Sequence, residues 1–273
     1  MALLSGLLMA GGAWAEPITS HPGFFANPKE VFRPLSADPR ELQLALRLTM
    51  PVSQSNVGDI AIGDYFGLYR WVLPWEDSYV QWSVGGGVFA RFDLVSVDKS
   101  LLVNDYQAEM PVDIRIGKWS TRLLPYHISS HLGDDFIKTS GILPGKYSFD
   151  SFKWLFAYDP ISSLRLYAGY NYVIRNSTVD LGRNALQAGL EWVSGWWGGG
   201  HAQTFWVNDF QSWQRTAWNP GIVTQLGVRL AHDPRDKQTL SCFMEYGSGP
   251  LYYGQLYNQK ESHWVTGVRF DLL

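Results

Sequence analysis

Polar and apolar residues alternate over most of this chain with a period of two residues. In ELQLALRLTM, residues 41–50, every even position is apolar, and the odd positions include Glu41, Gln43, Arg47 and Thr49. The alternation recurs in YVQWSVGGGVFARFDL (79–94), NDYQAEMPVDIRI (104–116) and LRLYAGYNYVIR (164–175). Successive side chains of a β-strand point to opposite faces, so this period predicts strands with one apolar and one polar face.

The polar faces carry charges of both signs well inside the strands. They are Arg91, Asp93, Glu109, Asp113, Arg115, Arg165, Glu191, Arg229 and Glu245. In a secreted β-sandwich, which is the alternative, such charges would be buried in an apolar core at high cost. In an outer-membrane barrel the apolar face meets lipid and the polar face lines the interior. We therefore predict an all-β protein, a transmembrane antiparallel up-and-down β-barrel.

We expect about 12 strands, connected by turns that alternate between short and long. The expected ranges are 41–50, 59–71, 79–94, 102–116, 119–130, 147–158, 164–174, 184–193, 201–208, 221–231, 238–247 and 263–272. Short periplasmic turns, longer extracellular loops and an even strand number are typical of bacterial outer-membrane barrels. Opposite charges on neighbouring strands would pair and fill the interior, which favours a closed barrel over a general porin.

The N-terminus indicates export. Residues 1–15, MALLSGLLMAGGAWA, combine a short apolar run with a small-residue cleavage site and are interpreted as a secretory signal peptide. Residues 16–40 are rich in proline and polar groups, and we expect an N-terminal periplasmic arm there. Residues 41–273 would form the barrel in the outer membrane of a Gram-negative bacterium, with the barrel-assembly machinery as a partner during biogenesis.

Composition narrows the classes of partner. The formal net charge of −3 gives no basis for nucleic-acid binding. The single cysteine, Cys242, cannot form an internal disulfide or a cysteine-based metal site, and we expect it to be a small lipid-facing residue.

The stretch YHISSHLGDDF, residues 126–136, concentrates histidine, serine and aspartate at the extracellular end of a predicted strand. Lys153 on the next strand must point inward, so Ser148 and Asp150 point outward. If residue 131 opposes residue 146 in an antiparallel hairpin, His127 faces Asp150 and Ser129 faces Ser148. A serine, a histidine and a carboxylate would then meet on the outer surface.

A His-x-Ser motif on an outward strand face, with a polar partner on the neighbouring strand, resembles the outer-membrane phospholipase A and lipid A deacylase families. The resemblance implies a lipid acyl-ester hydrolase with Ser129 as nucleophile, His127 as general base and Asp150 as its orienting acid. It also implies outer-membrane phospholipid or lipopolysaccharide as substrate, acted on by a monomer or a homodimer.

Three further segments, FRPLSADPRE, GVFARFDL and YHISSHLGDDF, are together similar to a family of bacterial outer-membrane proteins of unknown function. This resemblance covers most of the chain and implies no activity. A non-catalytic structural barrel or a narrow channel therefore stays open as the alternative to a hydrolase.

Two other interpretations of residues 126–136 remain open. One is a polar loop at the level of the lipid headgroups. The other is a metal site, because His127 and His131 point the same way and could share an ion with Asp134 or Asp135. The two aspartates could also hold Ca²⁺, which could bind a substrate phosphate.

Overall fold

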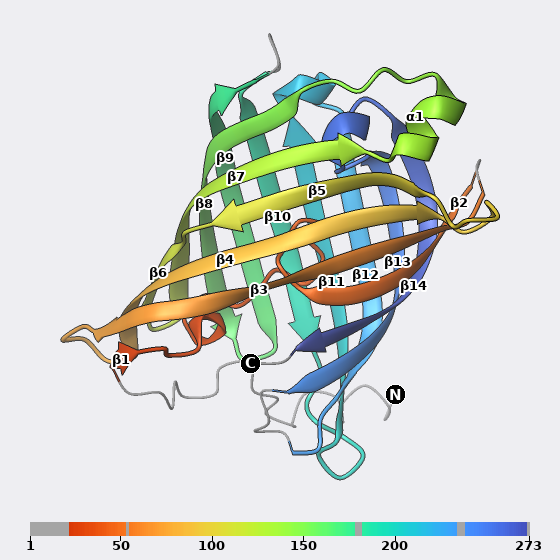
Figure 1. Ribbon diagram of the computed structural model, residues 1–273. Coiled ribbons are helices and arrows are strands. Elements are labelled where there is room, and N and C mark those ends of the chain that lie inside the picture. The colour runs from red at the N-terminus through yellow and green to blue at the C-terminus, as the bar shows by residue number, and fades with distance from the viewer. Residues whose placement is uncertain (1–21, 53–54, 178–181, 234–237, 272–273) are drawn as a thin grey trace.

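The computed structural model describes residues 22–52, 55–177, 182–233 and 238–271, and this part of the chain forms a closed 12-strand antiparallel barrel (Figure 1). Its strands are β2 (Leu44–Pro51), β3 (Val57–Val72), β4 (Ser78–Asp93), β5 (Leu101–Glu109), β6 (Val112–Ile116), β7 (Trp119–Leu132), β8 (Tyr147–Ile161), β9 (Leu164–Asn176), β10 (Asn184–Val193), β11 (Ala202–Trp213), β12 (Pro220–Leu230), β13 (Thr239–Pro250) and β14 (Lys260–Asp271). Each of these strands pairs with the next one around the ring, β5 and β6 sharing one place between β4 and β7, and β14 pairs with β2, so the ring is closed. The expected strands and fold class are confirmed.

The expected strand over residues 102–116 is divided into β5 and β6, which together occupy one position in the wall between β4 and β7. The division falls at Pro111, whose nitrogen carries no hydrogen to donate to a neighbouring strand. A further short strand, β1 (Gly23–Phe24), pairs with β3 outside the ring.

The two longest connections, 133–146 and 251–259, lie at one end of the barrel. That end carries the helix α1 (Asp134–Ser140) and the short 3₁₀ helices η2 (Gln214–Thr216) and η3 (Gly254–Leu256) (Figure 1). The turns at 117–118 and 162–163 lie at the opposite end, toward which β14 runs as it reaches Asp271. By the rule for bacterial barrels, the end with the long connections faces outside the cell.

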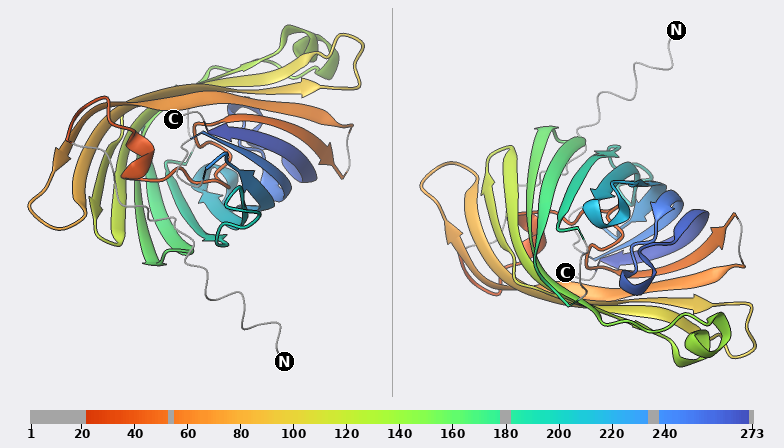
Figure 2. Two further views of the ribbon diagram at one scale, coloured as in Figure 1. Left: turned by 90° about the horizontal axis from the view of Figure 1, so that it is seen from below. Right: turned by 90° about the horizontal axis from the view of Figure 1, so that it is seen from above.

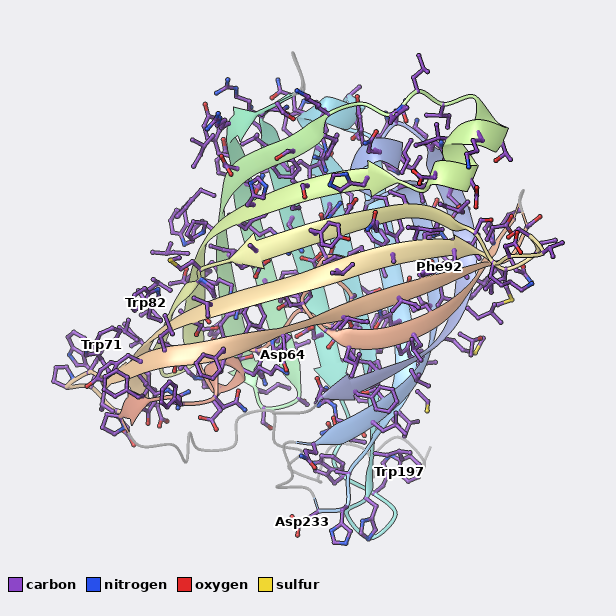
Figure 3. The ribbon with its side chains drawn as sticks, viewed as in Figure 1. Asp64, Trp71, Trp82, Phe92, Trp197 and Asp233 are labelled. Atoms are coloured by element: carbon purple, nitrogen blue, oxygen red, sulfur yellow. The ribbon has the colours of Figure 1, made fainter. Side chains whose placement is uncertain are left out.

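The outer surface of the wall is apolar. Among its exposed side chains are Leu46, Ile62, Phe66, Tyr106, Trp154, Phe156, Tyr170, Leu186, Leu226, Met244 and Trp264. Trp71, Trp82 and Trp197 project from this surface toward the end with the short turns (Figure 3), as the aromatic girdle of a membrane barrel does. Cys242 is also exposed, as expected. Among the described helices, none is both long and apolar enough to cross a bilayer.

Seven of the nine predicted interior charges are buried in the lumen, and Arg229 is half-buried. Those with little exposure are Arg91, Glu109, Asp113, Arg115, Arg165, Glu191 and Glu245. Asp93 departs from the prediction, because it ends β4 and its carboxylate accepts the Val95 N–H at 2.8 Å outside the lumen network.

The N-terminal segment, which we define as residues 27–43, occupies the lumen. Residues 31–40 fall within the range expected as a periplasmic arm, yet the chain runs inside the ring of strands here (Figure 2). Phe32, Leu35 and Asp38 are almost completely buried. The signal peptide predicted at residues 1–15 lies outside the described residues. Leu42, assigned to the lipid-facing side by its parity, packs instead with Tyr65 in the interior, because regular pairing of β2 begins only at Leu44.

Ion pairs and hydrogen bonds tie the N-terminal segment to the inner wall. Asp38 accepts from Lys153 at 3.3 Å, from Gln187 at 2.9 Å and from Gln211 at 3.0 Å. Further contacts are Arg33–Asp159, Arg40–Asp105, Ser36 N–H to Glu191, and Arg269 to the Ser36 carbonyl. These partners lie on strands around the ring, so the segment crosslinks the wall from within.

A loop at the extracellular end, residues 251–259, also folds inward. Tyr253 is fully buried and donates its hydroxyl to Asp59 at 2.8 Å, while the Arg91 guanidinium lies 5.2 Å from its ring centroid. The N-terminal segment and this loop together occupy much of the described lumen.

Candidate functional site at the outer rim

The hairpin of β7 and β8 positions the predicted site residues. Its observed register pairs His127 with Asp150 and Ser129 with Ser148, as expected from the constant sum of paired residue numbers. Lys153 points inward, where it contacts Asp38. The predicted outward direction of the site residues follows from the same parity, because residues 127, 129, 148 and 150 are all at least partly exposed.

Three of these side chains form a chain of contacts. Nδ1 of His127 lies 2.7 Å from Oδ1 of Asp150, and Nε2 lies 3.3 Å from Oγ of Ser148. If Nδ1 carries the proton and donates it to the carboxylate, Nε2 presents a lone pair to the serine hydroxyl. This order of contacts, acid to imidazole to hydroxyl, is the one that activates a serine nucleophile.

Ser148 is the hydroxyl that the structure brings to the imidazole, whereas Ser129 was the predicted one. Ser129 lies directly across the hairpin from Ser148, on the same outer face. The predicted register could have indicated Ser148 as well, because the long histidine side chain reaches diagonal as well as opposite positions on the neighbouring strand. Parity and register place both serines beside His127, and only its side-chain rotamer selects between them.

The site lies on the outside of the barrel, half exposed. The side chains of His127 and Asp150 are 49% and 46% exposed, and Phe152, the next outward residue of β8, is also exposed. Both strands end nearby in the connection 133–146 at the extracellular end. The hydroxyl and imidazole therefore face the surroundings of the barrel rather than its lumen.

Basic side chains lie on the segments around the site. A β-bulge in β9 shifts the register by one residue and sets Arg175 opposite Asp150. Ser177 donates to the Lys146 carbonyl at 3.3 Å and accepts the Ser148 N–H at 2.9 Å. Arg183 donates to the Ile174 carbonyl at 3.4 Å. Three basic residues, Lys146, Arg175 and Arg183, thus lie on the segments that flank Ser148.

The predicted metal ligands are not brought together. His131 packs edge-on against Tyr106, with ring centroids 5.9 Å apart. Asp134 and Asp135 begin α1, where Asp135 pairs with Lys138 at 3.2 Å on the exposed surface. Across the described ranges, no three acidic, histidine or cysteine side chains gather in a group that could hold an ion.

A family model described as a protein of unknown function, DUF1207, matches residues 18–271 of this sequence. The chain belongs to the DUF1207 family. The match covers the strands of the barrel and the N-terminal segment inside it. Among curated proteins, none matches this sequence.

Solved structures similar to this DUF1207 barrel are outer-membrane proteins. The outer-membrane phospholipase A of Escherichia coli superposes with a TM-score of 0.57 at 14% identity, over 88% of this chain and 96% of that one. The outer-membrane phospholipase of Salmonella typhi, solved as a dimer with bound calcium, gives a TM-score of 0.56 at 15% identity, over 85% and 93%. At such low identities the similarity concerns the fold alone. Together with the apolar outer surface, this fold identifies the DUF1207 chain as an outer-membrane β-barrel.

Proposed function

We propose that this protein is a lipid acyl-ester hydrolase that works on the outer leaflet of the outer membrane. The observation that carries the proposal is the contact chain from Asp150 through His127 to Ser148 on the lipid-facing side of the barrel. His127 is half exposed, and water could satisfy both of its ring nitrogens. A purely structural histidine at such a position would need neither the carboxylate nor the hydroxyl. The similar fold of two outer-membrane phospholipases supports the same reaction class.

The reaction would proceed through an acyl-serine. His127 Nε2 takes the proton of the serine hydroxyl as Oγ attacks the ester carbonyl, and Asp150 stabilises the imidazolium that forms. The imidazolium then gives its proton to the leaving alkoxide when the ester C–O bond breaks. Water, deprotonated by the same imidazole, cleaves the acyl-serine and releases a fatty acid.

Ser148 is the nucleophile that the contact distances favour, and Ser129 is the alternative from the His-x-Ser motif. The two stand opposite each other, so one attacking hydroxyl would have the other beside the developing oxyanion. Opposed side chains in an antiparallel pair have Cβ atoms about 4.5–5.5 Å apart, within the reach of a tetrahedral intermediate.

The surrounding charge favours an anionic lipid as substrate. Arg175, Lys146 and Arg183 lie on segments next to the serine pair, at the extracellular end where phosphate-bearing headgroups of the outer leaflet would lie. Phospholipid and lipopolysaccharide both carry such phosphates, so the basic rim suits either of them.

Fatty-acid release from outer-membrane lipids in mixed micelles tests the proposal. The purified full-length protein should release fatty acid, and His127→Ala and Ser148→Ala should each lower the rate by roughly 10³-fold or more, because the two groups act as a unit. Ser140→Ala, in the connection beside the site, is the matched control and should keep full activity. A wild-type protein without acyl release on either lipid contradicts the proposal.

Labelling with a fluorophosphonate distinguishes the two serines. If Ser148 is the nucleophile, the phosphonylated peptide contains Ser148, and Ser129→Ala still labels. A label on Ser129 that survives Ser148→Ala would assign the nucleophile to the His-x-Ser motif instead.

A further inference from the structure

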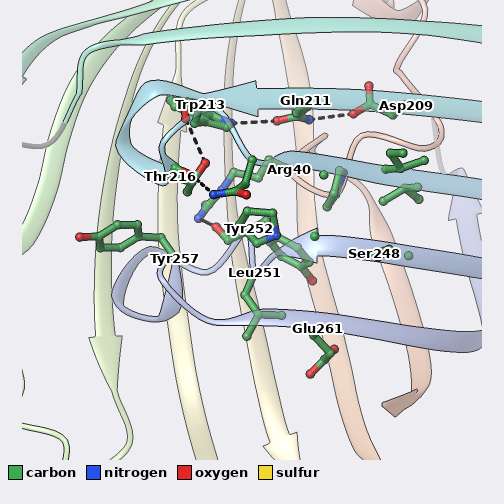
Figure 4. A pocket seen from close by; sticks show the side chains of 18 of the residues that line it. Arg40, Asp209, Gln211, Trp213, Thr216, Ser248, Leu251, Tyr252, Tyr257 and Glu261 are labelled. Atoms are coloured by element: carbon green, nitrogen blue, oxygen red, sulfur yellow. Dashed lines mark hydrogen bonds between the residues drawn. The ribbon is translucent and has the colours of Figure 1, made fainter. Parts of the chain in front are cut away.

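A cavity lies inside the extracellular half of the barrel, away from the outer rim. It is bounded by the inner faces of β11 to β14, by Pro39 and Arg40 of the N-terminal segment, and by the loops that contain η2 and η3 (Figure 4). The empty space among these residues, including the part open to solvent, is about 790 Å³. His127, Ser148 and Asp150 do not line it. The enclosed part of this space has a volume of about 80 Å³, which is room for several water molecules.

Three glycines lie in the wall of this cavity, and one of them, Gly221, faces open space. Gly221 of β12 and Gly247 and Gly249 of β13 all line it and share the inward parity of Val223 and Glu245. A Cβ atom added at Gly221 would meet only the Gln211 carbonyl oxygen, at 3.7 Å. The backbone there tolerates a side chain, so the space in front of Gly221 is open rather than filled by a neighbour.

Aromatic rings surround a cation at the mouth of the cavity. The Arg215 guanidinium lies 4.0 Å from the ring centroid of Trp213, 5.4 Å from Phe149, 5.8 Å from Tyr147 and 5.9 Å from Tyr257. It donates to the Tyr147 hydroxyl, and no carboxylate of the described residues pairs with it within 4.0 Å. The rings hold the guanidinium in place and leave its charge uncompensated.

The cavity presents unsatisfied donors. Nε of Arg215 and Nη1 of Arg40 are buried and have no hydrogen-bond partner among the described residues. The remaining contacts of Arg40, to Asp105 and to the Tyr252 carbonyl, use only Nη2. Buried donors without partners are costly, which points to an acceptor that the chain itself does not supply.

The carboxylates of the cavity already have donors. Asp209 accepts from Tyr167 and Gln187 at 2.7 Å each, Glu261 accepts from Arg91, and Glu245 accepts from Gln225 at 2.7 Å. What the cavity lacks is therefore hydrogen-bond acceptors for the guanidinium groups of Arg40 and Arg215. A cation or a neutral donor would leave Arg40 and Arg215 as they are, whereas an anion would satisfy both.

We propose that this cavity is a binding site for a small organic acid with a ring. Its carboxylate accepts hydrogen bonds from the guanidinium groups of Arg215 and Arg40, and its ring packs among Trp213, Tyr252 and Tyr257. The site is reached from the extracellular side, between the loops that carry η2 and η3, and it is independent of the proposed lipid hydrolysis.

Isothermal titration calorimetry on the folded full-length protein in detergent tests this site with two probe pairs. Benzoate is compared with benzyl alcohol, and glucuronate with glucose, so that each pair keeps the ring and removes the carboxylate. We expect at least one acid to bind roughly tenfold or more tightly than its neutral partner, the usual effect of charged hydrogen bonds. The pair that responds identifies an aromatic acid or a sugar acid.

Two variants locate the binding. Arg215→Gln should weaken the acid by roughly tenfold or more, and Gly221→Leu should abolish binding by filling the cavity. Arg175→Gln, on the outer face, is the matched control and should bind as the wild type does. Absence of binding by both acids, or wild-type binding in Gly221→Leu, overturns the proposal. If Arg215→Gln does not fold, Gly221→Leu decides alone.

Discussion

At the scale of single residues, the lumen is stabilised by buried charges that satisfy one another. Arg122 is 1% exposed and donates to both carboxylate oxygens of Asp113, at 2.8 and 3.0 Å. It also contacts Glu41 at 3.2 Å, and its guanidinium lies 4.6 Å from the Phe32 ring. One side chain thus joins two wall strands to the N-terminal segment.

Arg122→Ala should lower the free energy of unfolding by about 3–5 kcal/mol, because it leaves the buried Asp113 carboxylate without its partner. Lys138→Ala breaks a pair with Asp135 whose side chains are 72% and 62% exposed, and it should cost about 0–1 kcal/mol. Urea unfolding of the detergent-folded protein, followed by tryptophan fluorescence, measures both changes. Equal small losses would show that the lumen network contributes little.

At the scale of elements, the inward position of loop 251–259 depends on close packing at one glycine. A Cβ atom on Gly254 would lie 2.4 Å from the Tyr147 ring and 2.6 Å from the Ser130 Cβ. The Gly254 N–H donates to Asp105 at 2.8 Å, and Gln255 donates to Ser130 and to the Gly145 carbonyl. The loop is therefore fastened to β5, β7 and the connection that follows α1.

Gly254→Val should expel the loop from the lumen and expose it to added protease on intact cells. Gly145→Val is the matched control, since a Cβ there would meet only Gln255 Oε1, at 3.8 Å, and the loop should stay protected. Cleavage sites mapped by mass spectrometry report the result. Equal protection in the two variants would mean that packing at Gly254 does not hold the loop.

At the scale of the whole molecule, we expect the N-terminal segment to decide whether the barrel conducts. The lumen is occupied by residues 27–43 and by the inward loop, and the two make contact through Arg40 and the Tyr252 carbonyl (Figure 2). No open path along the axis is expected while both remain in place.

Wild-type protein should give little conductance in planar bilayers, and removal of residues 24–37 should raise it, because this deletion takes out Phe32 and Leu35 from the interior. Heat-modifiable migration in detergent gels serves as the control that the shortened protein still folds as a barrel. Large, stable channels from the intact protein would contradict the closed lumen and favour the channel alternative.

The sequence by itself determined the wall of this protein and most of its candidate site. Strand parity is a local property with a period of two, so the strands, their lipid-facing sides and the pairing of His127 with Asp150 could all be predicted. Only the tertiary structure decided what fills the barrel and which serine meets the imidazole. Arg33 meets Asp159 over a separation of 126 residues, and Tyr253 meets Asp59 over 194 residues. No local period encodes such contacts. Leu42 shows where strand parity stops being a guide. Its parity predicted a lipid-facing side chain, whereas the side chain packs in the space inside the closed ring.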